Sequence, residues 1–222
     1  MTLLVIPTQA NGFWRLESWI NSFKTPDFSQ IKETKQRKIA FFNYLLPMIE
    51  KENKKIKLLR VSIKNNQLNK TQINKLIKKY RLKKSTKKAL LNAIDIIPSS
   101  MVLAQAAIES NWGRSRFSKH WHNYFGIWCF KPDCGVVPKE RSENTTHEIA
   151  IFPSASKSVE YYMLNINRHF AYTLLRKIRQ YKRDNHLPIT GIDLSEGLVN
   201  YAEIGFDYIK QVQSIIKYNK LE

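Results

Sequence analysis

The sequence predicts a predominantly helical α+β fold with one small β-hairpin and an N-terminal helical extension. Apolar residues recur at helical spacing along most of the chain, as at Ile39, Phe42, Leu45 and Ile49. Residues 118–154 break this pattern, because aromatic residues cluster there and short β-type runs follow them. These observations indicate a helical protein that contains one small sheet.

The N-terminal part of the chain is expected to form several helices. The first long helix should end near Lys57 and should kink or break at Pro47, because proline lacks the amide hydrogen that a helix interior needs. A further helix is expected over 82–97, whereas the intervening segment 58–68 is ambiguous. A helix break at Pro98 then starts the next helix.

The predicted hairpin is made of two short runs, 135–137 and 147–152. The polar residues 142–145 lie between them and are typical of a turn, so the two runs are expected to pair as antiparallel strands. Helical periodicity resumes after Ser154, and the chain is expected to finish as two helices around Gly205.

Positive charge is distributed unevenly along the chain. The formal net charge is +19, and residues 24–88 carry 20 Lys and Arg against 4 Asp and Glu, whereas residues 89–222 carry 16 against 13. Such a segment favours a polyanionic partner, which could be the cell envelope or nucleic acid, or it is simply a solvated basic face.

Two features bear on the compartment. Cys129 and Cys134 are close enough in sequence to be bridged across a turn, and a disulfide would indicate an oxidising compartment such as the periplasm. A metal site is the rival interpretation, but His120 and His122 show no convincing ligand spacing, so no metal is expected. No stretch has the length of a membrane span, and residues 1–7 show no export signal.

Glu109 is the candidate catalytic residue that the sequence singles out. It ends an apolar helical run and precedes Trp112 and Gly113. A carboxyl at the edge of apolar packing has a raised pKa and stays protonated near neutral pH. The pattern is typical of a general acid that protonates a glycosidic oxygen, although a helix-terminal glutamate before an ordinary turn has the same spacing.

Several sequence words around Glu109 occur in a fixed order. They are QAAIESNWGRSRF (105–117), NYFGIWCF (123–130), CGVVP (134–138), THEIAIFPS (146–154), SVEYYMLNINRHFAYTLLR (158–176) and YAEIGFDYI (201–209). Together they resemble the catalytic core of the N-acetylglucosaminidases that cleave bacterial peptidoglycan, most clearly the Bax-type branch and more distantly the flagellar peptidoglycan hydrolases. The resemblance is strong over 95–222 and weaker over 28–53.

The resemblance implies a lysozyme-like catalytic domain over 95–222, preceded by a basic helical region over 1–94. It implies an endo-β-N-acetylglucosaminidase of the periplasm or cell envelope that hydrolyses peptidoglycan glycan strands with Glu109 as general acid. No cofactor is expected for this chemistry. The basic segment 24–88 would then hold the enzyme on an anionic envelope surface.

The resemblance also suggests two partners for Glu109. In the flagellar relatives a second acid lies on the hairpin, which makes Glu140 the preferred match here and Glu143 the alternative, whereas Glu148 is expected to be a structural anchor. Tyr201 matches an active-site tyrosine of the family. The separation of the two acids would distinguish inversion from a covalent intermediate, and the substrate's own acetamido group offers a third route.

Four residues are candidates for binding the glycan. Trp112, Tyr124 and Trp128 could stack on sugar rings or belong to the core. Asn123 could donate hydrogen bonds to glycan or peptide groups, as could the nearby Arg116.

Two other functions fit the same sequence. A muramidase or lytic transglycosylase also uses one glutamate in this context, and its product end would differ. A non-catalytic protein that binds nucleic acid or cell wall through 24–88 is the second alternative. Nucleic acid is disfavoured because Phe41, Phe42 and Tyr44 have core-like spacing, unlike the interleaved aromatic residues of single-strand binders.

Overall fold

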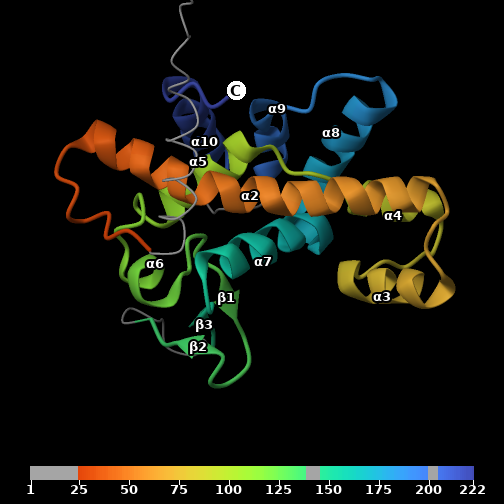
Figure 1. The fold of residues 1–222 in the computed structure, drawn as a ribbon, viewed down its shortest axis with the longest axis horizontal. Helices are drawn as coiled ribbons and strands as arrows, with labels where there is room; N and C mark the ends of the chain where they lie inside the picture. Colours follow the sequence, from red (N-terminus) through yellow and green to blue (C-terminus); the bar gives the residue numbers. More distant parts are fainter. Residues whose placement is uncertain (1–24, 139–145, 200–204) are drawn as a thin grey trace, which may run out of the picture.

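The long helix α2 crosses the molecule and organises its fold (Figure 1). The structure is a computed structural model that describes residues 25–138, 146–199 and 205–222. Its helices are α2 (Thr34–Lys64), α3 (Lys70–Tyr80), α4 (Lys87–Ala93), α5 (Ser99–Glu109), α6 (Arg116–Trp121), α7 (Ala155–Arg168), η1 (Phe170–Tyr172), α8 (Thr173–Asp184), α9 (Gly191–Ser195), η2 (Glu196–Leu198) and α10 (Phe206–Tyr218). The strands are β1 (Trp128–Cys129), β2 (Gly135–Val136) and β3 (Glu148–Ala150).

Of the kink or break predicted at Pro47, a break is wrong, because α2 continues through this residue as far as Lys64. Pro47 removes a hydrogen bond to the carbonyl of Asn43, but both residues are exposed, so water can satisfy that carbonyl. The opposite face of α2 buries Phe41, Leu45 and other apolar side chains, and this packing keeps the helix continuous. The ambiguous segment 58–68 is therefore mostly the last turns of α2.

The helix expected over 82–97 is much shorter than predicted, since α4 covers only Lys87–Ala93. Thr86 caps its start by accepting a hydrogen bond from the amide of Ala89 (3.2 Å). The preceding helix α3 begins with a capping box between Asn69 and Gln72. Both helices lie at the C-terminal end of α2 (Figure 1).

The predicted hairpin is confirmed, and the sheet has one strand more than expected. β2 pairs antiparallel with β3 in a register that sets Gly135 opposite Ala150. β1 pairs antiparallel with the other edge of β3, so the strand order is β1-β3-β2. The fold is thus predominantly helical with a small three-stranded antiparallel sheet, as the α+β prediction required.

One hydrophobic core joins the N-terminal helix to the rest of the chain. α2 packs against α5 and α7, and α10 packs against α5. The core contains Phe41 and Leu45 from α2 together with Met101 from α5 and Met163 from α7. The boundary predicted at residue 94 stays a prediction, but the side chains on its two sides are packed together.

The loop that carries this boundary is fixed by a fully buried arginine. Arg179 of α8 donates to the backbone carbonyls of residues 92, 93, 95 and 96, and to the side chain of Asn167 (2.7 Å). The carboxylate of Asp95 in the same loop pairs with Arg60 of α2 (3.2 Å) and Arg183 of α8 (3.0 Å). This cluster ties α2, α8 and the start of α5 into one unit.

None of the helices in the described part of the chain combines the length and the apolar composition that a membrane crossing requires.

Candidate active site

Glu109 is the last residue of α5, at the point where a buried helix reaches the surface. The side chains from Ser100 to Ala107 are buried, whereas that of Glu109 is partly exposed. The chain then turns sharply, because Asn111, Trp112 and Gly113 all have positive φ angles. Gly113 is required at this turn, since an added Cβ would lie 2.3 Å from the ring of Phe28.

Two elements distant in sequence approach the carboxyl of Glu109. The hydroxyl of Tyr208 in α10 donates a hydrogen bond to Oε1 of Glu109 (2.7 Å). Gly126, with φ of +60°, lies on the other side, where an added Cβ would be 3.3 Å from Oε2. The positive φ favours glycine here, and an added Cβ would be in tight contact with Oε2.

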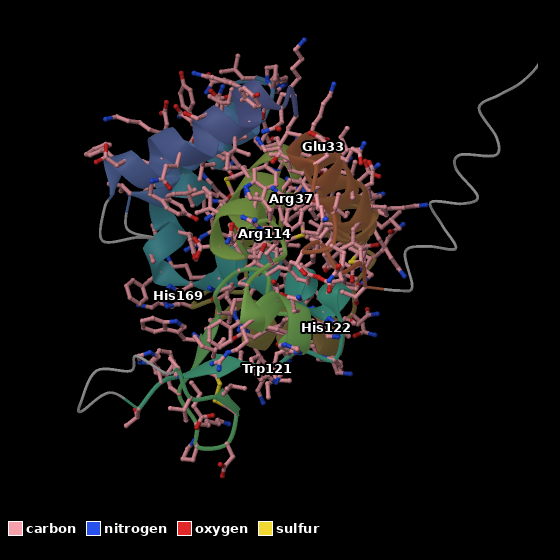
Figure 2. All side chains as sticks on the ribbon, turned by 90° about the vertical axis from the view of Figure 1, so that its left-hand side faces the viewer. Glu33, Arg37, Arg114, Trp121, His122 and His169 are labelled. Atoms are coloured by element: carbon pink, nitrogen blue, oxygen red, sulfur yellow. A yellow bond between two sulfur atoms is a disulfide. The ribbon has the colours of Figure 1, made fainter. Side chains whose placement is uncertain are left out.

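The loop that carries Gly126 is positioned by α6 and by Asn123. α6 ends beside the sheet, where the amide of Phe152 donates to the carbonyl of Trp121 (3.0 Å) (Figure 2). The side chain of Asn123 then donates to the carbonyls of Ile127 and Ala150 (both 2.9 Å) and accepts from the amide of Ile127 (3.0 Å). These bonds hold the backbone at Gly126 against Glu109.

Buried hydroxyl and aromatic groups surround the base of Glu109. Gln105, one helical turn before Glu109, bonds to the hydroxyls of both Tyr208 and Tyr162. The ring of Phe125 stacks on that of Tyr162, with ring centroids 4.0 Å apart and planes 9° from parallel. Burial raises the pKa of Tyr172 in η1, and the negative charge of Glu109 adds to this rise. Tyr172 therefore lies close enough to Glu109 for the carboxylate charge to act on its hydroxyl.

Two predicted glycan-binding residues belong to the core instead. Tyr124 has no exposed surface and packs near Phe41 and Tyr44, so its ring offers no face to a sugar. Asn123 is 1% exposed and directs its polar atoms to the backbone, so it supports the loop and does not reach a substrate. The sequence could not distinguish the two settings, because tyrosine and asparagine occur both in protein cores and in sugar-binding sites.

The predicted tryptophans differ in exposure. Trp128 is 52% exposed and stacks on His147, with ring centroids 3.9 Å apart. Trp112 is partly buried against Phe41 and Phe42, and the amino group of Lys38 lies 4.9 Å from its ring. Trp128 thus remains a candidate stacking platform, two residues after Gly126.

The candidate second acids and the candidate tyrosine lie outside the described residues. This applies to Glu140, Glu143 and Tyr201, whose predicted roles the structure does not test. Glu148 is described and is buried, and its carboxylate accepts hydrogen bonds from the amides of Asp133 (3.2 Å) and Gly135 (2.8 Å). The expectation that Glu148 is a structural anchor is confirmed.

The predicted disulfide between Cys129 and Cys134 is present and closes the loop between β1 and β2. The Sγ atoms of both cysteines and the carboxylate of Glu148 lie within 4.8 Å of one another, which is close enough for a metal site. Both sulfurs are joined in the disulfide, however, and the carboxylate is held by backbone amides. This group therefore does not suit a metal ion.

Sequence reasoning gave no role to Gln105, Gly126, Tyr172 or Tyr208. Gln105 could have been found, because residues four apart lie on the same face of a helix. Tyr208 and Gly126 lie in sequence words that also carry the family resemblance, but their distance in sequence from Glu109 hides the contact. Only the fold brings α10 and the loop at Gly126 to the end of α5.

Comparison with known proteins identifies the family of the chain. Residues 84–221 match the Glucosaminidase family, described as mannosyl-glycoprotein endo-beta-N-acetylglucosaminidase. The chain belongs to the Glucosaminidase family. Protein bax of Escherichia coli K12 is 30% identical over 200 residues, which cover 84% of this chain and 71% of that protein. The catalytic domain of the autolysin Auto from Listeria monocytogenes matches with a TM-score of 0.48 and 20% identity over 97% of this chain and 98% of that one.

Membership of the Glucosaminidase family confirms the resemblance recognised in the sequence and makes the chain a glycoside hydrolase. The matched region includes Glu109, Gly126 and Tyr208. A purely non-catalytic binding protein is therefore not the expected function. The family match does not name the catalytic residue, so this assignment rests on the geometry of the site.

Proposed function

We propose that the protein is an endo-β-N-acetylglucosaminidase that hydrolyses the glycan strands of bacterial peptidoglycan, with Glu109 as the general acid. The observation that supports this most directly is the setting of the Glu109 carboxyl. It emerges from a buried helix, receives a hydrogen bond from Tyr208 on one oxygen and has Gly126 beside the other. A carboxyl held in this way can present a proton in one direction.

The surroundings of Glu109 suit a sugar substrate. Gly126 has no side chain, so no Cβ stands against Oε2 at this position. Trp128 follows two residues later with half of its surface exposed, and the His147 ring stacked on it holds the indole in place. An exposed, supported aromatic ring is a suitable platform for a pyranose ring.

We further propose that Glu140 acts as the second acid, with Glu143 as the alternative, and that Tyr201 assists. A carboxylate on this segment would activate water or stabilise positive charge on the anomeric carbon. Tyr201 would orient the acetamido group of N-acetylglucosamine. Separate Glu140→Gln and Glu143→Gln variants would identify the acid, because only loss of the functional one should lower kcat strongly.

The test of the proposed function is product analysis. Purified peptidoglycan is digested with the wild type, with Glu109→Gln and with the control Glu50→Gln, in which an exposed α2 glutamate is changed. The products are reduced with borohydride, and the reduced end sugar is identified by mass spectrometry. We expect reduced N-acetylglucosamine from the wild type and the control, and loss of activity in folded Glu109→Gln by roughly 10²–10⁴-fold.

Other product ends would contradict this proposal. Reduced muramic acid would identify a muramidase, and a 1,6-anhydro end would identify a lytic transglycosylase. Full activity of Glu109→Gln would show that Glu109 is not the acid, whichever bond is cut.

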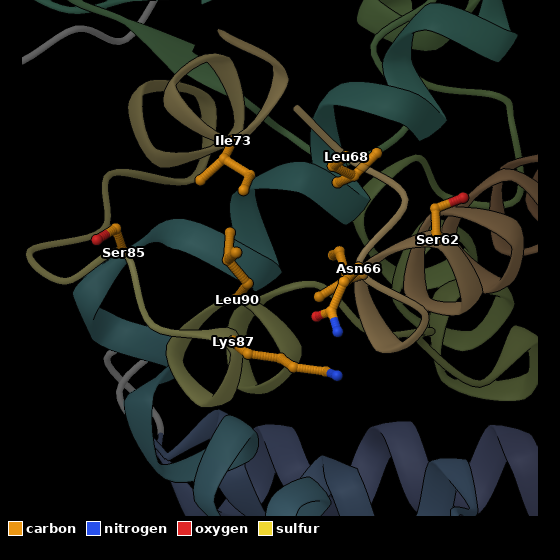
Figure 3. Close-up of a pocket in the computed structure, with 8 residues that line it drawn as sticks. Ser62, Asn66, Leu68, Ile73, Ser85, Lys87 and Leu90 are labelled. Carbon is orange, nitrogen blue, oxygen red and sulfur yellow. The ribbon is translucent and has the colours of Figure 1, made fainter. Parts of the chain in front are cut away.

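We also propose that the region before residue 95 attaches the catalytic domain to an anionic cell wall. Within it, residues 64–88, here called the basic lobe, contain ten Lys and Arg and no Asp or Glu. The lobe includes α3, and it borders a small pocket of about 100 Å³ whose lining is partly apolar (Figure 3). That pocket is lined by Ser62, Ile63, Asn66, Leu68, Ile73, Ser85, Lys87 and Leu90, none of which belongs to the elements around Glu109. Charge complementarity favours an acidic polymer as the partner of this lobe.

Wall attachment is tested by co-sedimentation with purified sacculi over a range of salt concentrations. A triple variant with Lys70, Lys75 and Lys78 changed to glutamine should bind less and show a weaker salt dependence. The matched control changes the exposed lysines at 210, 217 and 220 in the same way. Equal binding by both triple variants would contradict a role for the basic lobe.

The proposed location is the periplasm or another part of the cell envelope. The disulfide between Cys129 and Cys134 supports an oxidising compartment, because such bonds are rare in reducing cytosol. Alkylation of thiols in protein taken directly from cells tests this proposal, since an oxidised pair stays unlabelled.

A further inference from the structure

A chain of three buried hydrogen bonds leads from α7 through α5 to the carboxyl of Glu109. The hydroxyl of Tyr162 donates to Oε1 of Gln105. Nε2 of Gln105 donates to the hydroxyl of Tyr208 (3.0 Å), and that hydroxyl donates to Oε1 of Glu109 (2.7 Å). Gln105 is 0% exposed, Tyr162 2% and Tyr208 3%, so these bonds are shielded from water.

The direction of each bond in this chain is determined by its neighbours. An amide nitrogen can only donate, so Tyr208 must accept from Gln105 and has its single hydrogen left for Glu109. The amide of Gln105 is itself oriented, because its oxygen accepts from Tyr162. The hydrogen bond from Tyr162 thus holds Gln105 in the orientation in which the proton of Tyr208 points to Glu109.

This direction has a consequence for the acid. Since Oε1 of Glu109 accepts a hydrogen bond from Tyr208, the carboxyl proton is placed on Oε2. Oε2 is the oxygen beside Gly126, a residue without a side chain. The same hydrogen bond stabilises the ionised carboxylate more than the protonated acid, so it also affects the pH at which the acid loses its proton.

The ring of Tyr162 links this chain to the opposite wall of the site. Its stacking partner is Phe125, which directly precedes Gly126. One residue of α7 thereby supports both sides of the Glu109 carboxyl: Oε1 through its hydroxyl and the loop beside Oε2 through its ring.

We propose that Tyr162, Gln105 and Tyr208 form a directional relay that places the catalytic proton on Oε2 of Glu109 and sets the alkaline limit of activity. The proposal rests on the proposed role of Glu109 as general acid. Tyr162 and Gln105 act through other residues and are positioning residues. Tyr208 of α10 contacts the Glu109 carboxyl directly, and Tyr172 of η1 lies close enough for the charge of Glu109 to act on it.

The test compares pH profiles of kcat and kcat/KM on soluble peptidoglycan fragments for the wild type and two hydroxyl deletions. In Tyr208→Phe the carboxylate loses a stabilising donor, so the alkaline limb should move to higher pH and kcat should fall roughly tenfold. Tyr162→Phe frees the Gln105 amide to turn its oxygen toward Tyr208, which then competes with Glu109 for the hydrogen. Its alkaline limb should move in the same direction.

The matched control is Tyr44→Phe, which removes the hydroxyl of another buried tyrosine, one that bonds to Thr25 (3.1 Å) and lies outside the relay. This variant should keep the wild-type pH profile. A shift as large as that of Tyr162→Phe would show that loss of any buried hydroxyl has this effect and would overturn the proposal.

A third replacement keeps the tyrosine hydroxyl and should shift the alkaline limb in the opposite direction. Replacing Tyr208 with 3-fluorotyrosine makes the hydroxyl a stronger donor, so the alkaline limb should move to lower pH. An unmoved limb in the fluorinated protein and in both Phe variants would overturn the relay if Glu109→Gln is inactive. Activity of Glu109→Gln would instead overturn the acid assignment itself, so the two failures are distinguishable.

Discussion

The protein contains two buried polar networks that differ in form and in consequence. The cluster around Arg179 is charged and saturated, because the guanidinium donates to four backbone carbonyls and to Asn167, while Asp95 nearby pairs with two further arginines. Burial lowers the pKa of Arg179 to about 10, against the opposing attraction of Asp95. The network under Glu109 consists instead of neutral donors in a line that ends on a partly exposed carboxyl.

This difference indicates what each network does. A cluster in which every donor and acceptor already has a hydrogen-bond partner holds the backbone in one position, because no group is free to change its partner. A linear chain has a direction, and a change at one end alters the state of the group at the other. We therefore expect the Arg179 cluster to determine stability and the chain through Gln105 to determine activity.

The largest effect on stability is expected for Arg179→Leu. It leaves the carbonyls of residues 92, 93, 95 and 96 and the side chain of Asn167 without this donor, so the free energy of unfolding should fall by about 3–5 kcal/mol. Chemical denaturation measures this, with Lys177→Leu on the exposed face of the same helix as the control. A loss below about 1 kcal/mol would contradict the structural role of the cluster.

The next largest effect is expected for Gly126→Ala, beside Glu109, where activity should be lowered more than stability. The added Cβ meets Oε2 at 3.3 Å on a backbone with φ of +60°. Displacing the carboxyl should lower kcat roughly 10–100-fold, while the strained backbone removes about 1–2 kcal/mol of stability. Unchanged turnover by the folded variant would show that the position of Oε2 is not critical.

Glu148→Gln tests whether the buried Glu148 stabilises the fold, as the Arg179 cluster is expected to do. A neutral amide accepts less strongly from the amides of Asp133 and Gly135, so stability should fall by about 1–2 kcal/mol. The disulfide in this loop should also become easier to reduce, as measured by thiol release in a dithiothreitol series. Glu160→Gln, a surface glutamate paired with Lys157, is the control.

The smallest effect is a pH dependence of stability at His169. Burial lowers the pKa of His169, and the nearby Arg81, Arg176 and Arg168 add to this. The neutral ring caps η1 by accepting from the amide of Ala171 (3.3 Å). Since the unfolded chain binds this proton more readily, the contribution is present above the usual histidine pKa of about 6.5 and is lost as the pH falls through the lowered pKa.

The comparison for this prediction is His169→Asn, which can cap η1 but does not titrate. The melting temperature of the wild type should fall relative to this variant as the medium is acidified below pH about 6.5. Parallel curves for the two proteins would contradict the role of the neutral ring.

Local sequence patterns predicted much of this fold, because they report on contacts near in sequence. The helix through Ile39 to Ile49, the strand pair around Gly135 and Ile149 and the disulfide at Cys129 follow from such patterns. The break at Pro47 was wrong because packing of the opposite face outweighs one lost hydrogen bond. Strand β1 was not predicted, because a strand of two residues shows no alternation of apolar and polar residues.

The candidate site was less predictable because it is assembled from distant segments. Glu109 was predicted as the acid from its local context, but the groups around its carboxyl come from α7, α10 and the loop at Gly126. The sequence left both sugar stacking and core packing open for Tyr124, which is buried, because an aromatic residue near an active site has the same sequence signature in either setting. The contact between Tyr208 and Glu109, which lie 99 residues apart, can be seen only once the fold is known.

The central claim, that Glu109 is the general acid, is tested most directly by varying how much the leaving group needs a proton. Wild type and Glu109→Gln are compared on peptidoglycan and on a chitobiosyl glycoside with a dinitrophenolate leaving group, which departs without protonation. We predict a loss of roughly 10²–10⁴-fold on peptidoglycan and a much smaller loss on the activated glycoside. Equal losses on both substrates would contradict the assignment, because Glu109 would then serve folding or binding and not proton donation.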